Sequence, residues 1–415
     1  MKDNWNELTI GNEINLLGGF PFSSSKFNED GDGVPLIRIR DLLKSSQETY
    51  FSGSYSNIYL INEGDVLIGM DGDFHIVKWK NSPSLLNQRI LKVSGKKSGE
   101  IDIDFLFYYL KPFLLDVHNK TAATTVKHLS TFDVSRAVDL FPPLPQQQKI
   151  AKILTTVDTV IEKTESAIAK YQAIKQGLMH DLFTRGIDVN TGKLRPTPQD
   201  APELYKESAL GWIPRDWEVK KINEISSLVT NGFVGVATPF YTNRDNGILY
   251  LFGTNIRANY LDYRDVRYVT EDFHKKQLKS QLKEGDMLTV QSGHIGTSAV
   301  IPANYEQVNC HALIITRFDK EIINSNFICH YLNSDLGMKR QEVLFVGSTI
   351  KHINTSDLAK HKVFVPNKRE QDEAVRRLIN VQQNTENEQS TLAKYQQLKA
   401  GLLQDLLTGK VEVNV

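Results

Sequence analysis

The sequence has few cysteines and no long apolar run, and each shortage excludes a class of protein. The two cysteines, Cys310 and Cys329, provide neither a disulfide framework nor the spacing of a metal site. No apolar run approaches the roughly 20 residues that a membrane-spanning helix needs. The first residues also lack the apolar core of a secretory signal. We therefore expect a protein of the reducing cytoplasm that does not associate with a membrane.

An excess of charge of one sign is also missing. The 49 lysines and arginines balance the 49 aspartates and glutamates, so no global field attracts a polyanion. Any contact with a nucleic acid must then come from local clusters of side chains.

Motifs for catalysis are absent as well. There is no glycine-rich phosphate loop, and Phe141-Pro142-Pro143-Leu144 lacks the polar residue with which amino-methyltransferases hold a target amine. Asp71-Gly72-Asp73 has no further ligand nearby, and we predict a surface turn there rather than a metal site. We therefore expect no catalysis and no metal in this chain.

The sequence does contain an internal duplication. Lys170-Tyr171-Gln172 recurs as Lys394-Tyr395-Gln396 at an offset of 224 (395 − 171), and 125–128 recurs as 349–352 at the same offset. Glu63-Gly64-Asp65 recurs as Glu284-Gly285-Asp286 at 221 (284 − 63). Trp5 corresponds to Trp217, and we predict core packing for this pair. The chain thus consists of two similar units in tandem.

Each unit ends in a segment whose apolar residues alternate three- and four-residue steps, which predicts a coiled-coil helix. The helices are expected at 146–186 and 367–410, each beginning just after a proline, Pro145 or Pro366. A helix this long with a one-sided apolar stripe needs a partner, and the second unit supplies one of matching length. We predict that the two pack together as an antiparallel pair.

The rest of each unit contains short strand-like and helical stretches bounded by Gly, Asp and Asn. Strands are expected at 34–39, 66–68 and 313–315, and helices at 105–115 and 327–333. The predicted fold is therefore α+β, with two similar mixed domains at 1–145 and 213–366 separated by the long helices. Residues 187–212, with three prolines, are interpreted as a linker.

These segments resemble the specificity subunit of type I restriction-modification enzymes, over essentially the whole chain. The residues that carry the resemblance are Pro142-Pro143-Leu144-Pro145-Gln146-Gln147, Tyr171…Lys175-x-Gly177-Leu178-Met179-x-Asp181-Leu182, Leu210-Gly211-Trp212-Ile213-Pro214-x-x-Trp217-Glu218-Val219 and Tyr395…Lys399-x-Gly401-Leu402-Leu403-x-Asp405-Leu406. One position departs from the pattern. Family members often carry Glu-Gln after the proline, as in Glu370-Gln371, whereas the first unit has Gln146-Gln147.

The resemblance implies two target-recognition domains that each read half of a bipartite, asymmetric site in double-stranded DNA. It also implies helices that bind two methyltransferase (modification) subunits, joined by restriction (motor-nuclease) subunits for cleavage. S-adenosylmethionine would bind to the partner methyltransferases, and no cofactor to this chain. The partner-binding residues would be Tyr171, Lys175, Leu178, Leu182, Tyr395, Lys399, Leu402 and Leu406.

The repeated Thr-Val/Ile-Lys-His element is a candidate for DNA contact, through Thr125, Lys127, His128, Thr349, Lys351 and His352. A structural turn common to both domains is the alternative. Residues that read bases should instead lie where the units differ, because Arg matches the guanine edge and Gln the adenine edge. The candidates are Ser24, Lys26, Arg38, Arg40, Gln88 and Arg89 in the first domain, and Asn231, Tyr241, Arg244, Asn255, Arg257, Gln291 and His294 in the second.

Two other functions remain open from the sequence. The chain could be the specificity half of a split type II-like restriction-methylation enzyme, which neighbouring genes would reveal. It could also be a coiled-coil interaction protein that binds no DNA, which a binding assay with a methyltransferase partner would reveal.

Overall fold

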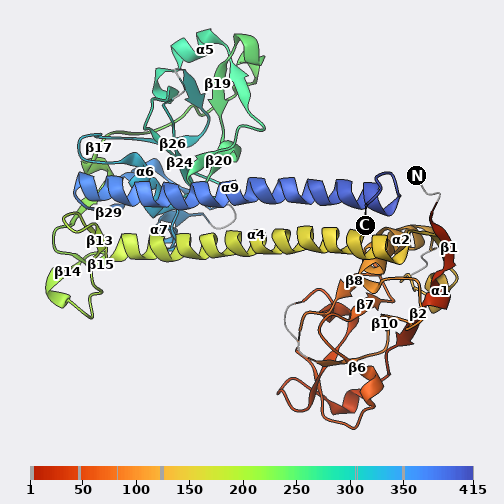
Figure 1. Ribbon diagram of the computed structural model, residues 1–415. Coiled ribbons are helices and arrows are strands. Elements are labelled where there is room, and N and C mark those ends of the chain that lie inside the picture. The colour runs from red at the N-terminus through yellow and green to blue at the C-terminus, as the bar shows by residue number, and fades with distance from the viewer. Residues whose placement is uncertain are drawn as a thin grey trace. The chain divides into compact units, whose positions relative to one another are not determined.

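The long helices α4 (Leu144–Thr184) and α9 (Lys368–Leu407) each contribute to two compact units. The computed structural model describes residues 4–44, 48–81, 83–121, 126–303, 305, 307–347 and 351–414. Unit 1 comprises Met1–Glu165 with Ser390–Val415, and unit 2 comprises Ser166–Gln389. Each unit therefore holds one mixed α/β domain and part of both helices (Figure 1). The predicted α+β class with two long helices is confirmed, whereas the predicted domain boundaries stay a prediction.

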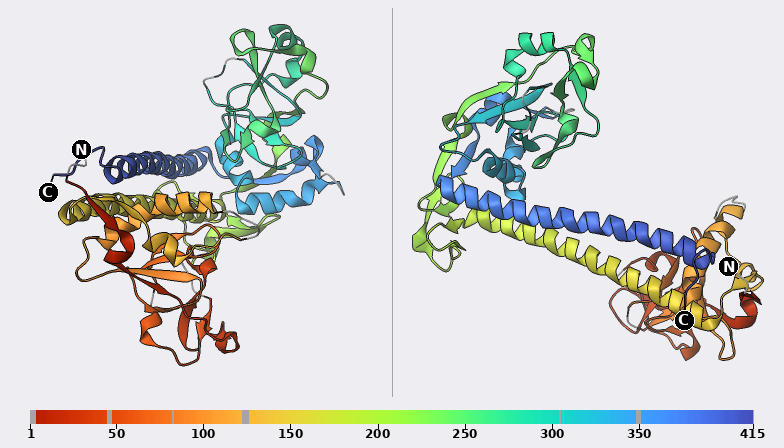
Figure 2. Two further views of the ribbon diagram at one scale, coloured as in Figure 1. Left: turned by 90° about the vertical axis from the view of Figure 1, so that its right-hand side faces the viewer. Right: turned by 45° about the horizontal axis from the view of Figure 1, so that its top comes forward.

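In unit 1 the first part of α4 runs antiparallel to the last part of α9. Leu154 and Leu406 belong to the same buried cluster. Further along α4, Asp158 Oδ1 lies 2.5 Å from Nζ of Lys399, which comes earlier in α9. Residue numbers therefore increase along α4 in the direction in which they decrease along α9 (Figure 2).

Unit 2 contains the equivalent arrangement. Leu182 and Leu378 share a buried cluster, and Lys175 Nζ donates to Gln382 Oε1 at 3.2 Å. Lys175 corresponds to Lys399 and Gln382 to Asp158, each at the offset of 224 (399 − 175 and 382 − 158). The internal duplication thus extends to the bonds between the helices, and the predicted antiparallel packing is confirmed in each unit.

A buried glutamine anchors the start of each long helix. Gln147 Nε2 donates to the carbonyls of Glu100 and Pro142 at 2.8 Å each, and its Oε1 accepts from Asp102 N at 2.8 Å. Asp102 in turn caps the following helix, because its Oδ1 accepts from Phe105 N. The equivalent contacts in unit 2 join Gln371 to Ile322 O, Pro366 O and Asn324 N.

Replacing Gln371 with alanine is expected to lower the free energy of unfolding by about 2 kcal/mol or more. The change leaves two carbonyls and one N–H without their partner, and such losses typically cost about 1–3 kcal/mol each when the group stays buried. Denaturant titration measures the effect. Gln148→Ala, at an exposed position of the other long helix, is the control and should change stability by less than about 0.5 kcal/mol. An equal effect of both variants would contradict the anchoring role.

The two mixed domains are built on sheets of the same strand order. In unit 1 the order is β2 (Ile14–Gly18), β10 (Ile90–Gly95), β7 (Val66–Gly69), β8 (Ile76–Lys78), and all pairs are antiparallel. In unit 2 it is β17 (Ser226–Asn231), β26 (Leu313–Phe318), β23 (Met287–Val290), β24 (Ser298–Val300), also antiparallel. Central strands such as β7 and β23 are buried on both faces, which explains their continuous apolar runs.

A second sheet in each domain contains one parallel strand pair. Unit 1 has the order β3 (Phe27–Asn28), β5 (Tyr50–Phe51), β4 (Val34–Ile37), β9 (Ser84–Leu86), β6 (Leu60–Ile61), with β4 and β9 parallel. Unit 2 has β18 (Tyr241–Thr242), β22 (Arg267–Val269), β19 (Ile248–Leu251), β25 (Val308–Cys310), with β19 and β25 parallel. The strands predicted at 34–39, 66–68 and 313–315 are confirmed as β4, β7 and β26.

Short helices and edge pairs complete each domain. The helices predicted at 105–115 and 327–333 fall in α2 (Ile103–Lys120) and α6 (Ser325–Leu332). The remaining elements of unit 1 are β1 (Asn6–Thr9), α1 (Ile10–Glu13), α3 (Thr131–Ser135) and β11 (Val138–Phe141). Those of unit 2 are β16 (Glu218–Lys221), β20 (Ile256–Arg257), β21 (Tyr260–Leu261), α5 (Glu271–Lys276), α7 (Asp335–Gln341), β27 (Phe345–Val346), β28 (His352–Ile353), α8 (Thr355–Lys360) and β29 (Lys362–Val365). Trp217 is fully buried, as predicted, whereas Trp5 is half-buried.

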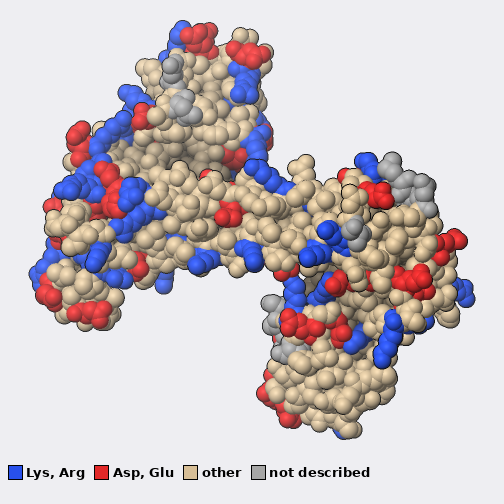
Figure 3. Space-filling model, in the orientation of Figure 1, with Lys and Arg blue, Asp and Glu red and all other residues tan. Residues whose placement is uncertain are grey.

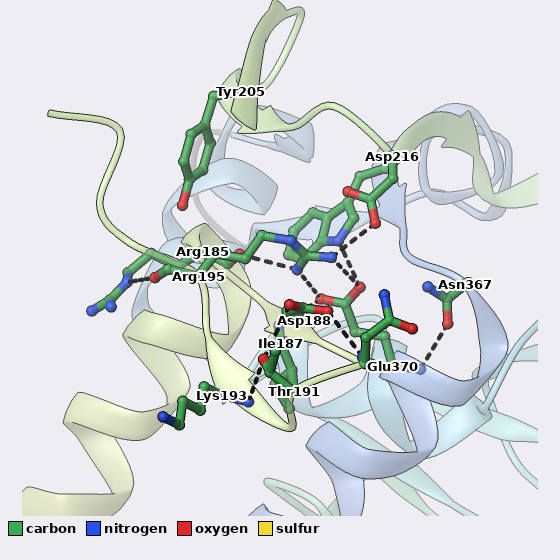
Figure 4. Close-up of polar contacts among 12 residues, drawn as sticks. Arg185, Ile187, Asp188, Thr191, Lys193, Arg195, Tyr205, Asp216, Asn367 and Glu370 are labelled. Atoms are coloured by element: carbon green, nitrogen blue, oxygen red, sulfur yellow. Dashed lines mark hydrogen bonds and ion pairs between the residues drawn. The ribbon is translucent and has the colours of Figure 1, made fainter. Parts of the chain in front are cut away.

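The predicted linker, 187–212, folds into two hairpins in unit 2. They are β12 (Ile187–Asp188) with β13 (Lys193–Leu194), and β14 (Tyr205–Ser208) with β15 (Gly211–Pro214). Gly192 and Gly211 supply the positive φ of the turns. Arg195, between the hairpins, points at the buried carboxylate of Glu370 near the start of α9 (Figure 4). Pro198 and Pro202 therefore mark turns of a folded segment.

Surface charge is mixed in both units. On the face drawn in Figure 3, acidic and basic side chains alternate without an extended surface of one sign. Within the described part of the chain, none of the helices combines the length and hydropathy needed to cross a bilayer.

Candidate nucleic-acid interface

In unit 1 the Lys127-His128 element packs against the turn that follows β7. Leu129 N donates to Met70 O at 2.7 Å, and Gly72 N donates to Lys127 O at 3.0 Å. Gly72 has a φ of +77°, which favours glycine, and the predicted turn at 71–73 is confirmed. Backbone hydrogen bonds thus hold together two segments that lie far apart in the sequence.

The side chains at this place form a small polar constellation. His128 Nδ1 lies 2.6 Å from Asp71 Oδ1, and Arg89 Nε lies 3.8 Å from Asp71 Oδ2. Met70 N donates to Arg89 O at 2.9 Å, which joins the loop before β10 to the turn. The Arg89 side chain is 57% exposed, and that of His128 is 46% exposed. These groups can therefore hydrogen-bond to a molecule outside the protein.

Unit 2 repeats the backbone of this arrangement. Ile353 N donates to Gln291 O at 3.0 Å, in place of the Leu129–Met70 bond. Ser292 and His352 form an isolated antiparallel bridge, as Asp71 and His128 do in unit 1. Gly293 has a φ of +87°, matching Gly72. We call these residues the turn clusters: 70–73, 88–89 and 127–128 in unit 1, and 291–294, 311–312 and 351–352 in unit 2.

The side chains of the two turn clusters differ at equivalent positions. The Asp71 position is taken by Ser292, and the Arg89 position by Ala312. Arg89 and Ala312 share a left-handed backbone, with φ of +71° and +48°. A common framework therefore presents different hydrogen-bonding groups in the two units, which suits the reading of two different sequences.

Several predicted DNA-binding residues lie in the turn clusters. In unit 1 these are Gln88, Arg89, Lys127 and His128, and in unit 2 they are Gln291, His294, Lys351 and His352. Lys127 Nζ donates to His118 O at 2.6 Å, so its ammonium is partly engaged at the end of α2. Thr125 and Thr349 lie outside the described residues. Burial lowers the pKa of His311, the unit 2 neighbour of Ala312.

The other candidates in unit 1 lie on different loops. Ser24 and Lys26 are exposed in a short 3₁₀ turn. Arg38 and Arg40 both pair with the buried Asp41, at 3.7 and 3.9 Å, and Arg38 also bonds to Thr49. Arg40 is the freer of the two, with 61% of its side chain exposed.

One candidate in unit 2 is corrected by the structure. Asn255 is only 2% exposed, and its side chain is saturated by bonds to Phe252 N and to the carbonyls of Asp262 and Asp265. It caps a short 3₁₀ turn, as Asp41 does in unit 1. Asn255 is therefore structural and not available to a DNA base.

The remaining unit 2 candidates are divided between two places. His294 Nε2 and Arg257 Nη1 both lie at the carbonyl of Ile256, at 3.0 and 3.1 Å. Asn231 Oδ1 accepts from Gln291 Nε2 at 3.3 Å. The ring centroid of Tyr241 lies 5.1 Å from Arg267 Cζ, and Arg244 is exposed. Tyr241 and Arg244 belong to the region of the second sheet and not to the turn cluster.

Six of the eight predicted partner-binding residues pack against the core or the opposite helix of their own unit. Leu182 and Leu406 are 1% and 4% exposed in the cores, so their prediction as partner contacts is wrong. Leu178 and Leu402 are half-buried against the same cores, and Tyr171 and Tyr395 are half-buried. Lys175 and Lys399 are engaged by the opposite helix. Because the apolar period marks the internal seam, it does not identify the outer face.

A family model and individual known proteins to which the chain is similar all point to one family. A family model described as the type I restriction modification DNA specificity domain matches residues 2–171 and 214–397. The EcoBI specificity subunit of Escherichia coli is 29% identical over 389 residues, covering 91% of this chain and 79% of that protein. The MjaVIII specificity subunit of Methanocaldococcus jannaschii is 24% identical over 403 residues, covering 96% and 87%. The solved S subunit of a type I restriction-modification system from M. genitalium has a TM-score of 0.62 at 14% identity, covering 99% and 97%, and supports the fold.

Proposed function

The chain belongs to the family of type I restriction-modification DNA specificity subunits, and on that premise we propose that its two domains each read one half of a split, asymmetric DNA site. The observation that supports this is the pair of turn clusters. They share backbone bonds and turn geometry but differ at Asp71/Ser292 and Arg89/Ala312. Two readers on one framework with different side chains fit half-sites of different sequence.

The long helices provide the spacing between the half-sites in this proposal. α4 is continuous over 41 residues, which at 1.5 Å per residue gives a rod of about 60 Å. A rod of fixed length sets a fixed gap between half-sites, as the spacing of dimeric DNA readers does.

Catalysis is assigned to partners. The specificity subunits of this family are non-catalytic. We propose that two methyltransferase subunits, which bind S-adenosylmethionine, and restriction subunits supply the chemistry, and that the complex acts in the cytoplasm. No cofactor is proposed for this chain.

The test is to express the chain with the modification subunit encoded beside it, in a host without adenine methylation of its own, and to map methylated adenines. The expected result is one bipartite, asymmetric motif with a fixed gap, which disappears when the chain is omitted. Methylation that does not depend on the chain, or no association with the modification subunit, would favour a coiled-coil interaction protein. A methyltransferase fused to a nuclease in the adjacent gene would favour the split type II-like enzyme.

Inserting or deleting one helical turn near Ala167 in α4 is expected to change the gap length and leave the half-site bases unchanged. The reason is that the change alters the rod and not the turn clusters. The same methylation map measures it. The same insertion at the exposed turn around Asn190 is the control and should leave the gap unchanged. Altered letters within a half-site would contradict this division of roles.

A further inference from the structure

We infer that Arg89 reads a guanine in the half-site of the first domain, and that Asp71 is the positioning residue that orients it. This inference rests on the proposed function. The position equivalent to Arg89 in the second domain is Ala312, so the second half-site is read by other groups.

The backbone at Arg89 is imposed by the framework. A left-handed φ of +71° is unfavourable for a residue other than glycine, because it brings Cβ close to the following carbonyl oxygen. The equivalent Ala312 has the same unusual conformation, so the turn itself requires it. The bond from Met70 N to Arg89 O fixes the residue against the turn after β7. The base of the Arg89 side chain is therefore held in place.

The guanidinium is oriented from one side only. Arg89 Nε faces Asp71 Oδ2 at 3.8 Å, and the other oxygen of Asp71 is held by His128 at 2.6 Å. Among the described residues, no group hydrogen-bonds to either Nη atom of Arg89, and its side chain is 57% exposed. Two parallel N–H donors are thus left for an outside acceptor pair.

Guanine is the base edge that matches two parallel donors, because its O6 and N7 both accept hydrogen bonds in the major groove. A phosphate is the competing acceptor. The carboxylate of Asp71 beside Arg89 offsets the positive charge that a phosphate needs and repels the phosphate itself. A neutral base edge does not suffer this repulsion. The arrangement therefore favours a base over the DNA backbone.

The second domain has neither the arginine nor the aspartate at the equivalent positions. Ala312 has no donor, and Ser292 has no charge with which to orient one. His352, at the position of His128, is exposed, and Gln291, at the position of Met70, is half-buried. A guanine read at this framework position is thus expected in the first half-site only.

The test is the methylation map of Arg89→Ala and Arg89→Lys chains expressed with the modification subunit. Both variants are expected to lose discrimination at a single guanine of one half-site, by about 10- to 100-fold, the worth of one bidentate pair. The gap and the other half-site should stay unchanged. Asp71→Asn should weaken the same preference to a smaller extent. Arg136→Ala, at another arginine of the first domain, is the matched control and should leave the motif intact.

The outcomes separate this inference from the proposed function. If the wild-type motif is bipartite but Arg89→Ala retains every guanine preference, the inference is overturned and the function stands. Full retention of the motif by Arg89→Lys would show that the fixed pair of parallel donors is not needed, and would also overturn it. A uniform loss of methylation with an unchanged thermal midpoint would do the same. Methylation that ignores the chain altogether would instead remove the proposed function.

Discussion

Replacing Glu370 with alanine is expected to lower the free energy of unfolding of unit 2 by about 3–5 kcal/mol, the usual cost of breaking a buried ion pair from one side. The carboxylate is 1% exposed and accepts from Arg195 Nη1 and Nη2 at 2.6 and 3.1 Å. It also accepts from Trp217 Nε1 at 3.2 Å and Ile187 N at 2.7 Å (Figure 4). Its removal leaves the buried Arg195 guanidinium with the exposed Asp216 as its ion-pair partner, at 2.8 Å, and leaves Trp217 Nε1 and Ile187 N without their acceptor.

The duplication supplies the control. Gln146 occupies the equivalent position in unit 1 and is half-buried, so Gln146→Ala should cost well under half as much. Replacing both members of the pair, by Glu370→Leu with Arg195→Met, should recover part of the loss, because no buried charge remains and Asp216, the other partner of Arg195, is exposed to solvent. Denaturant unfolding followed by tryptophan fluorescence measures all of these. A decrease in the free energy of unfolding of less than about 1 kcal/mol in Glu370→Ala would contradict the role of this ion pair.

Acidification from pH 6.5 to 4 is expected to destabilise unit 2 through two buried imidazoles. Burial, reinforced by Lys175, lowers the pKa of His330 to about 4, and burial, reinforced by Arg340, lowers that of His361 to about 4. Between pH 6.5 and 4 these two histidines bind protons in the unfolded chain but stay neutral in the folded chain. The stability is therefore fully present above pH 6.5 and falls as the pH drops towards 4, by up to about 3 kcal/mol per imidazole.

The equivalent positions in unit 1 carry no histidine, so a chain without the two imidazoles is a suitable comparison. Tyr108 stands where unit 2 has His330, and Ala137 where it has His361, at offsets of 222 (330 − 108) and 224 (361 − 137). A His330→Gln, His361→Ala chain should therefore lose less stability than wild type between pH 7 and 4.5. The free energy of unfolding at several pH values measures the difference. Identical pH dependence in both chains would rule out these imidazoles as its source, leaving carboxylates responsible.

The features that could be predicted from the sequence are those with a local or repeated signal. The three- and four-residue period placed the long helices close to α4 and α9, and the common offset identified the second copy. The same period misled the prediction of partner contacts, since Leu182 and Leu406 belong to the seam inside each unit. The period shows which face of a helix is apolar, but it does not show whether the same chain or a partner protein covers that face.

Features that depend on distant segments had no such signal. The polarity of Asn255 predicts a base contact, yet its bonds to Phe252, Asp262 and Asp265 arise from the path of the chain around a short turn. For Asp71 the sequence predicts only a turn, because nothing local places it beside Arg89. The sequence does contain a signal for Glu370, because the equivalent residue in the first unit is the neutral Gln146. The unit with the acidic residue is the one in which Arg195 forms an ion pair with it.

The turn clusters also bear on how such a protein acquires new targets. The bonds that hold them, from Leu129 to Met70 and from Ile353 to Gln291, use main-chain atoms only. Exposed Arg89 and half-buried Ala312 place a long cation or a methyl group on the same backbone. Substitutions of Arg89 by other residues are therefore expected to change the free energy of unfolding by less than about 0.5 kcal/mol, so recognition can change while the scaffold persists.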